Sequence, residues 1–169
     1  NPQGLVPVLE DDGQALNQSM ALIEYLDERY PKPALLPGDA VARQRVRAMA
    51  QLVACDIHPL NNLRVLRYLK GPLGQDEETV RAWYRHWVAE GFAALEARAE
   101  TYGDGQTCYA GMVTQADICL APQMWNARRF ECDLGAFPTL RAIDAHLHTL
   151  PAFADAAPEA QPDHPENRG

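Results

Sequence analysis

The sequence predicts an α+β protein in which a short β-hairpin and one helix precede an all-helical domain. Three observations lead to this prediction: a β-rich run with a turn opens the chain, the hydrophobic period changes to about 3.6 after residue 17, and only helical periodicity follows a Pro-rich stretch at residues 31–37. The 169 residues, 47% hydrophobic and 22% charged, are typical of a globular fold with one buried core.

The first sixteen residues are predicted to form the hairpin. The run "LVPVLE" at residues 5–10 is the first strand, residues 11–13 ("DDG") supply the turn, and "QAL" returns as the second strand. Pro7 lies inside the first predicted strand and has no N–H for a ladder, so it indicates an edge, a bulge or a cis peptide bond.

A helix is predicted from Gln18 to the residue before Pro31, with Leu22, Ile23 and Leu26 at helical spacing. The predicted organisation is a unit at 1–31, a linker at 32–38, a helical domain at 39–163 and a tail at 164–169. Four helical segments are expected in that domain: 38–70 as one helix or two joined near Pro59, 76–100, 114–130 and 138–150.

Local end signals support these helices. Asp39 is a possible cap, and "TQAD" fits a capping box in which Thr114 and Asp117 have structural roles only. The polar, Pro-rich residues 157–169 are expected to lie over the surface or to be disordered.

Composition excludes several classes of function. A net charge of -8 and a pI near 5.0 argue against a nucleic-acid partner, and no apolar run approaches the roughly 20 residues that span a bilayer. Four cysteines without metal-ligand spacing are expected to be buried or idle thiols in a reducing cytoplasm, with no metal site.

The start of the first helix is a candidate binding site. Unpaired N–H groups and a partial positive charge suit a carboxylate or phosphate, and the Ser19 hydroxyl after Gln18 adds a donor. The alternative is that Ser19 merely caps its own helix. A Pro-bent edge strand nearby can pair with an extended peptide, so the two features together suit a small peptide ligand.

The segment "NPQGLVPVLEDDGQALNQSMALIEYLDERYPKPALLP" resembles the second half of the thioredoxin-like domain of glutathione transferases. The segments "CDIHPLNNLRVLRYL", "ADICLAPQMWNARRF" and "DLGAFPTLRAIDAHLHTLPAFADAAPEAQPD" resemble more narrowly the zeta class, the glutathione-dependent maleylacetoacetate isomerases and their maleylpyruvate isomerase relatives. The resemblance covers residues 1 to about 163. It implies the C-terminal part of a thioredoxin-like domain followed by the helical domain of a glutathione transferase.

The resemblance assigns the glutathione contacts of the N-terminal unit. It implies that the Val6 backbone pairs with the cysteinyl part of glutathione and that Pro7 is in cis. Gln18 and Ser19 would bind the γ-glutamyl carboxylate and amine.

The resemblance also assigns residues of the helical domain. His58, Asn62 and Arg64 would lie on the stretch of the long helix that faces glutathione and the second substrate; otherwise each is an ordinary surface or core helix residue. Arg129 would lie near the pocket for the acidic substrate, with an exposed helix charge as the alternative. Arg128 is expected to be a plain surface charge.

The implied activity is cis-trans isomerisation of maleylacetoacetate to fumarylacetoacetate in aromatic amino-acid catabolism, by reversible thiol addition without a metal. An additional Arg at position 63 would suit a shorter diacid. The apolar Leu63 found there weakly favours maleylacetoacetate over maleylpyruvate. The alternatives are a maleylpyruvate isomerase, a general glutathione transferase, and a non-catalytic helical interaction module.

The family's thiol-activating motif, which contains Ser and Cys followed by Arg, is absent from the 169 residues. We therefore expect a fragment whose own activity is left open, from a protein that forms homodimers when full length.

Overall fold

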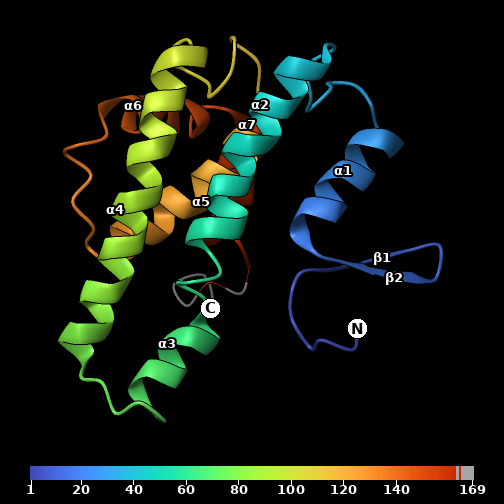
Figure 1. Ribbon diagram of the computed structural model, residues 1–169. Helices are drawn as coiled ribbons and strands as arrows, with labels where there is room; N and C mark the ends of the chain where they lie inside the picture. The colour runs from blue at the N-terminus through green and yellow to red at the C-terminus, as the bar shows by residue number, and fades with distance from the viewer. Residues whose placement is uncertain (163, 165–169) are drawn as a thin grey trace.

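The computed structural model describes residues 1–162 and 164. It consists of a β-hairpin with one helix, placed beside a larger bundle of helices (Figure 1). The elements in chain order are β1 (Val8–Asp11), β2 (Gln14–Asn17), α1 (Ser19–Arg29), α2 (Ala40–Gln51), the π-helix η1 (Leu52–Ile57), α3 (Leu63–Lys70), α4 (Glu77–Tyr102), α5 (Gln115–Arg129), α6 (Pro138–Leu147), α7 (Pro151–Ala156) and the 3-10 helix η2 (Pro158–Ala160).

The hairpin is shorter than the sequence predicts. β1 and β2 are antiparallel with Val8 opposite Asn17, and the intervening Asp12 and Gly13 both have positive φ, as a tight hairpin turn requires. The prediction that the first strand begins at residue 5 is wrong. Pro7 lies before β1 rather than inside it, because it has no N–H for the ladder.

Polar contacts join helix α1 to the hairpin and to the bundle. The Tyr25 hydroxyl donates a hydrogen bond of 2.6 Å to Asp11, which raises the pKa of the phenol. On its other side, Glu24 pairs with Arg47 of α2 at 2.9 Å. Leu22 is the buried residue of this helix.

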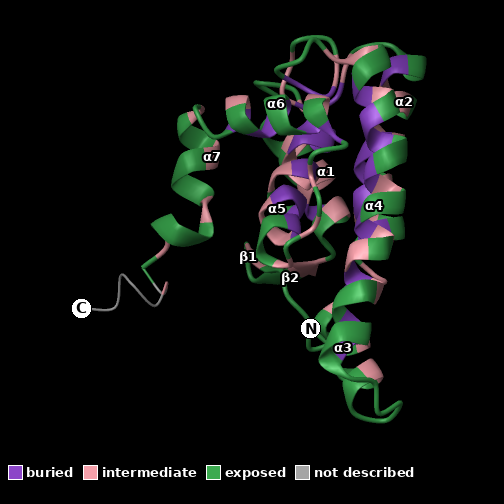
Figure 2. Ribbon diagram, turned by 90° about the vertical axis from the view of Figure 1, so that its left-hand side faces the viewer, coloured by how far each residue is buried: buried purple, intermediate pink, exposed green. Residues whose placement is uncertain are grey.

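The bundle contains the core. Helices α2, α4, α5 and α6 each carry buried residues (Figure 2), and these form one hydrophobic cluster. Fully enclosed side chains come from each of these helices, among them Met49, Phe92, Met124 and Ile143. Leu36 of the predicted linker is also buried in this core, so the segment between α1 and α2 is anchored there. The predicted domain boundaries themselves stay predictions.

The segment predicted as one helix or two joined near Pro59 forms two helices with a π-helical stretch between them. In η1 the His58 N–H donates to the Val53 carbonyl, a spacing of five residues. Ile57 at its end is buried against α4, where a Cβ on Gly91 would lie 2.2 Å from the Ile57 side chain. Only glycine fits at this crossing.

The predicted caps are confirmed. Asp39 accepts a hydrogen bond from the Ala42 N–H at 2.8 Å. Thr114 and Asp117 form the capping box of α5, and the second Asp117 oxygen accepts from the Cys108 N–H at 2.7 Å. Asp117 therefore fixes both the helix start and the preceding loop.

The C-terminal part is more regular than predicted, because α7 and η2 follow α6. Residues 157–162 lie over the surface as expected, and Trp125 donates a 2.6 Å hydrogen bond to Glu159. The predicted end of the helical domain at 163 and residues 165–169 of the predicted tail fall outside the described residues. Among the helices that the structure describes, none is long and apolar enough to cross a membrane.

Candidate functional site

The open end of the hairpin carries the first group of predicted ligand-binding residues. The Val6–Pro7 peptide bond is cis, which confirms that expectation. Val8, the first residue of β1, lies opposite Asn17, the last residue of β2. Pro7, just before β1, and Gln18, just after β2, therefore lie at the same end of the hairpin. Val6 is 92% exposed, so its backbone is accessible to a ligand.

The N-terminus of α1 lies next to this edge. Gln18 is the N-cap residue, with φ 71°, and its side chain makes no capping hydrogen bond. Ser19 is the first helical residue and is exposed, so the alternative in which Ser19 caps its own helix is wrong. The first N–H groups of α1 thus have no side-chain cap among the described residues. The Gln18 amide donates to Gln3 at 2.8 Å.

His58, Asn62 and Arg64 lie around the junction between η1 and α3. Asn62 is not inside a helix as expected. It caps α3, where its side-chain oxygen accepts from the Arg64 N–H at 3.1 Å. His58 and Arg64 are exposed. Within residues 1–162, no hydrogen bond or ion pair links these three side chains to Gln18 or Ser19.

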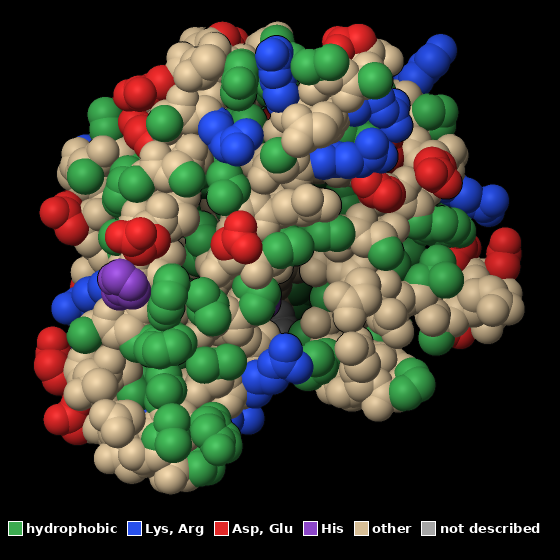
Figure 3. Space-filling model, in the orientation of Figure 1, with side chains coloured by type: hydrophobic (Ala, Val, Ile, Leu, Met, Phe, Trp, Pro, Cys, Tyr) green, Lys and Arg blue, Asp and Glu red, His purple; other side chains and the backbone are tan. Residues whose placement is uncertain are grey.

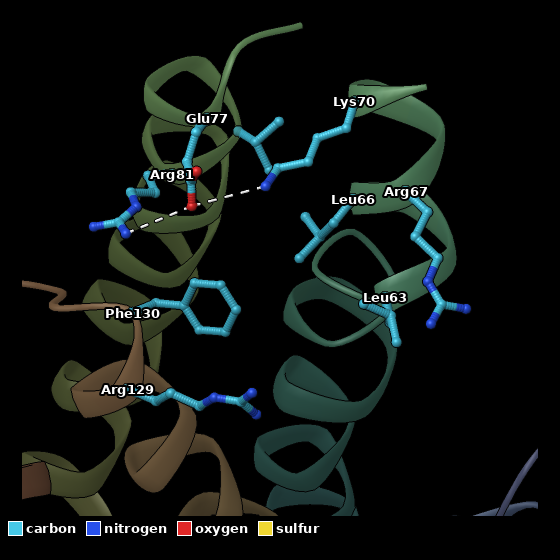
Figure 4. Close-up of a pocket in the computed structure, with 9 residues that line it drawn as sticks. Leu63, Leu66, Arg67, Lys70, Glu77, Arg81, Arg129 and Phe130 are labelled. Carbon is cyan, nitrogen blue, oxygen red and sulfur yellow. Dashed lines mark ion pairs between the residues drawn. The ribbon is translucent and has the colours of Figure 1, made fainter. Parts of the chain in front are cut away.

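A cavity of about 410 Å³ lies between α3, the first turns of α4 and the end of α5 (Figure 4). Its walls combine apolar and cationic side chains. The lining residues are Leu63, Leu66, Arg67, Lys70, Glu77, Val80, Arg81, Arg129 and Phe130. The lining contains four cationic side chains and one carboxylate, in a chain whose net charge is -8. This local excess of positive charge suits an anionic ligand.

Arg129 extends from the end of α5 toward α3 (Figure 4). Its guanidinium lies 5.5 Å from the Trp125 ring centroid and 5.9 Å from that of Phe130. No carboxylate of the described residues pairs with it. Aromatic faces on one side and no counter-ion leave this charge ready to bind a carboxylate.

Arg128 is not the plain surface charge expected from the sequence. Its guanidinium pairs with Asp144 of α6 at 2.5 Å, and the Asp144 side chain is only 8% exposed. A buried carboxylate requires a partner, which Arg128 supplies. The pair ties the last turn of α5 to α6, so the neighbouring Arg129 leaves the helix on a fixed backbone.

Phe130 is held from the α4 side. Its ring stacks on Tyr84 with centroids 3.7 Å apart, and its carbonyl accepts from the Arg85 side chain at 3.1 Å. Burial against this ring raises the pKa of Tyr84 to about 12, so the phenol stays protonated.

Four of the cavity's charged residues, Arg67, Lys70, Glu77 and Arg81, were missed by sequence reasoning. Glu77, in the first turn of α4, lies 3.8 Å from the Lys70 ammonium and 3.6 Å from the Arg81 guanidinium. A signal was present, because Leu63, Leu66 and Lys70 follow the i, i+3, i+7 spacing of one helix face. Arg67 on the same face also lines the cavity.

A second cavity of about 380 Å³ lies between η1 and α4. It carries the carboxylates of Asp56 and Glu90 and no cationic side chain, so it does not suit an acidic ligand. Cys55, expected to be buried or idle, is an exposed free thiol at this cavity. In the described part of the chain no cluster of side chains could hold a metal ion.

The chain is similar to known proteins over nearly its whole length. Residues 1–34 match the family model "Glutathione S-transferase, N-terminal domain". A probable maleylacetoacetate isomerase of Vibrio cholerae is 50% identical over 163 residues, which are 96% of this chain and 75% of that protein. The chain belongs to the zeta-class family of glutathione transferases, the maleylacetoacetate and maleylpyruvate isomerases.

Solved structures of this family match the fold closely. The holo structure of a maleylpyruvate isomerase, a bacterial zeta-class glutathione transferase, is 51% identical, with a TM-score of 0.94 over 96% of this chain and 77% of that one. A maleylacetoacetate isomerase from Anaeromyxobacter dehalogenans, with bound dicarboxyethyl glutathione and citrate in the active site, is 43% identical, with a TM-score of 0.88 over 98% and 76%.

Proposed function

We propose that this chain binds glutathione and isomerises maleylacetoacetate, with maleylpyruvate as the alternative substrate. The observation that carries the proposal is the cavity beside Arg129, whose lining holds four cationic side chains and one carboxylate within an acidic protein. The two substrates in the names of the relatives above, maleylacetoacetate and maleylpyruvate, are dicarboxylic acids, so an excess of cations is the expected complement.

The N-terminal unit is the proposed glutathione site. The exposed backbone at Val6, with Pro7 in cis, offers an edge to an extended peptide. The uncapped start of α1, with the Ser19 hydroxyl and the Gln18 amide, offers donors to a carboxylate. These two features fit the two ends of a short peptide that carries a free carboxylate.

His58, Asn62 and Arg64 are proposed to face glutathione from the helical side. His58 and Arg64 are exposed and free to turn toward a ligand, and the Asn62 cap fixes the start of α3 from which Arg64 projects. In this proposal Asn62 acts chiefly by holding Arg64 in place.

Arg129 is the residue proposed to bind a substrate carboxylate. Glutathione, when bound, supplies a thiolate that adds reversibly to the conjugated double bond, which permits rotation about that bond. Arg129 then orients the acid, and the apolar walls exclude water around it. Leu63, 57% exposed at the cavity, offers an apolar surface to the longer of the two diacids and favours maleylacetoacetate.

We also propose that the protein acts as a homodimer in a reducing cytoplasm. Free thiols at all four cysteines support the compartment. The exposed apolar side chains of Val8, Leu26 and Tyr30 on the N-terminal unit support association with a second copy. Sedimentation velocity across a concentration series tests this part.

The first test is calorimetric titration of the chain with glutathione, together with the Ser19→Ala and Gln14→Ala variants. Gln14 is exposed on the same hairpin and serves as the control. Loss of a charge-assisted contact of about 1.5 to 3 kcal/mol predicts roughly 10- to 100-fold weaker binding for Ser19→Ala only. Equal affinities in all three proteins would remove Ser19 from the site.

The second test is glutathione-dependent turnover. Isomerisation of maleylacetoacetate with loss of rate in Arg129→Met supports the proposal. Turnover of aryl halides without isomerisation would instead indicate a general transferase, and absence of both activities despite glutathione binding would indicate a non-catalytic module.

A further inference from the structure

The cavity beside Arg129 has a second charged end, to which the proposed function assigns no group of the ligand. Arg129 lies at one end, and the Lys70, Glu77 and Arg81 side chains meet at the other (Figure 4). Between them the walls are apolar, formed by side chains such as Leu66 and Phe130. A cavity with cations at both ends and hydrocarbon between them complements a chain with a carboxylate at each end.

The charges at the second end are not fully neutralised. Glu77 is the only carboxylate that lines the cavity, and it is shared between Lys70 at 3.8 Å and Arg81 at 3.6 Å. Arg81 also pairs with Glu131 at 3.3 Å, whereas no other described carboxylate pairs with Lys70. The Lys70 ammonium is therefore the cation with the weakest local compensation at this end.

The existing ion pairs are easy to exchange. The Lys70, Glu77 and Arg81 side chains are 50%, 68% and 45% exposed, and exposed pairs at such distances contribute little to stability. A ligand carboxylate that enters from the apolar side can replace Glu77 at Lys70 without leaving a buried charge unpaired. Glu77 then acts as an internal competitor for the subsite.

We propose that Lys70, assisted by Arg81 and opposed by Glu77, forms a second carboxylate subsite that binds the far end of a dicarboxylic acid held at Arg129. The inference rests on the proposed function for the identity of the diacid, but the subsite is tested without catalysis. Space-filling Figure 3 shows hydrophobic side chains gathered over α3 and the loop after it.

Binding of two eight-carbon probes separates the two ends of the cavity. Octanedioate has a carboxylate at each end, and octanoate has one. Titration at low ionic strength, followed by tryptophan fluorescence to which Trp125 beside Arg129 contributes, is expected to show at least five-fold tighter binding of octanedioate. Lys70→Met is expected to abolish that preference and leave octanoate affinity unchanged, whereas Arg129→Met weakens both probes.

A second pair of variants tests a change that is expected to strengthen, rather than weaken, the binding of octanedioate. Glu77→Gln removes the competing carboxylate and is expected to tighten octanedioate about three-fold without affecting octanoate. Glu78→Gln makes the same charge change one residue away, outside the cavity lining, and is the matched control. The proposed subsite would be overturned if the two glutamate variants changed octanedioate affinity equally. It would also be overturned if Lys70→Met weakened the binding of octanedioate and octanoate equally.

The outcome is independent of the isomerase proposal. If octanedioate selectivity depends on Lys70 but glutathione-dependent isomerisation is absent, the subsite stands and the proposed reaction fails. If isomerisation occurs and Lys70→Met changes neither probe, the reaction stands and the subsite fails.

Discussion

The N-terminal unit (residues 1–31) and the helical bundle differ sharply in how their apolar side chains are used. In the bundle, side chains such as Val46, Phe92 and Leu140 are fully enclosed. In the N-terminal unit Leu22 is the buried hydrophobic residue, whereas Val6 is 92% and Tyr30 65% exposed. The proposed glutathione contacts at Val6, Gln18 and Ser19 thus lie on a unit with little buried apolar surface, and the substrate cavity lies on a well-packed frame. We expect the N-terminal unit to unfold locally at a lower free energy than the helical bundle.

The largest effect is expected in the bundle, for Asp117→Ala. The carboxylate accepts from the buried N–H groups of Cys108 and Thr114 at 2.7 and 2.8 Å, and both donors would lose their acceptor. A loss of about 3 to 5 kcal/mol in the free energy of unfolding is expected, measured by urea denaturation. The control is Asp155→Ala, an exposed carboxylate. A loss as small as that of the control would mean that the loop and α5 are held by other contacts.

The next largest effect is expected in the N-terminal unit, for Leu22→Ala, and it tests whether this unit unfolds separately from the bundle. Leu22→Ala should lower the local stability of α1 by about 2 to 3 kcal/mol, because the side chain is buried. Hydrogen exchange should rise over residues 8–29 while bundle amides keep their protection. Leu26→Ala, on the same helix but 40% exposed, is the control. Equal loss of protection in α4 would mean that the two regions unfold together.

A smaller effect is expected at the polar contact between the regions. The Arg47–Glu24 pair is 38% and 42% exposed, so Arg47→Ala should cost under about 1 kcal/mol. Cys119 of α5, whose sulfur lies 3.6 Å from that of Met20, reports the separation of α1 from the bundle. Burial raises the pKa of Cys119 to about 12, so its thiol stays protonated and reacts slowly while the regions stay packed.

Alkylation of Cys119, followed by mass spectrometry of its peptide, measures this separation. The rate should rise up to about five-fold in Arg47→Ala and stay unchanged in Arg43→Ala. Cys108, buried within the bundle, should remain protected in both variants. Acceleration at Cys108 would contradict independent opening of the N-terminal unit.

The smallest effect concerns acid stability at one end of the bundle. Asp104 accepts from the Gln106 and Thr107 N–H groups, which lower its pKa in the folded state. Its contribution is therefore present above the unfolded-state pKa near 4 and is lost as the pH falls through the lowered value. Asp104→Ala should cost under about 1 kcal/mol at pH 6.5 and less at pH 2.5 by urea unfolding. The prediction would be refuted if the loss of unfolding free energy in Asp104→Ala grew toward low pH. It would also be refuted if that loss equalled the loss in Asp155→Ala.

Signals that act within a few residues were readable in the sequence. Asp39 and the Thr114–Asp117 box start their helices because a cap needs only its own first turn. The hairpin turn, the order of the elements and the cis bond before Pro7 could also be predicted, the last from family resemblance. The start of β1 was misplaced because strand length depends on which N–H groups find partners across the ladder.

The tertiary structure alone decided which side chains meet. Two adjacent arginines end α5, and only its packing against α6 directs Arg128 to Asp144 and leaves Arg129 at the cavity. The π-helical turn before His58 and the meeting of Lys70 with Glu77 depend in the same way on where α4 crosses its neighbours. The sequence by itself determined the helices, their caps and the family, since these follow from local chemistry and resemblance. The charge arrangement of the cavity was decided by contacts between segments distant in the chain, which no local pattern encodes.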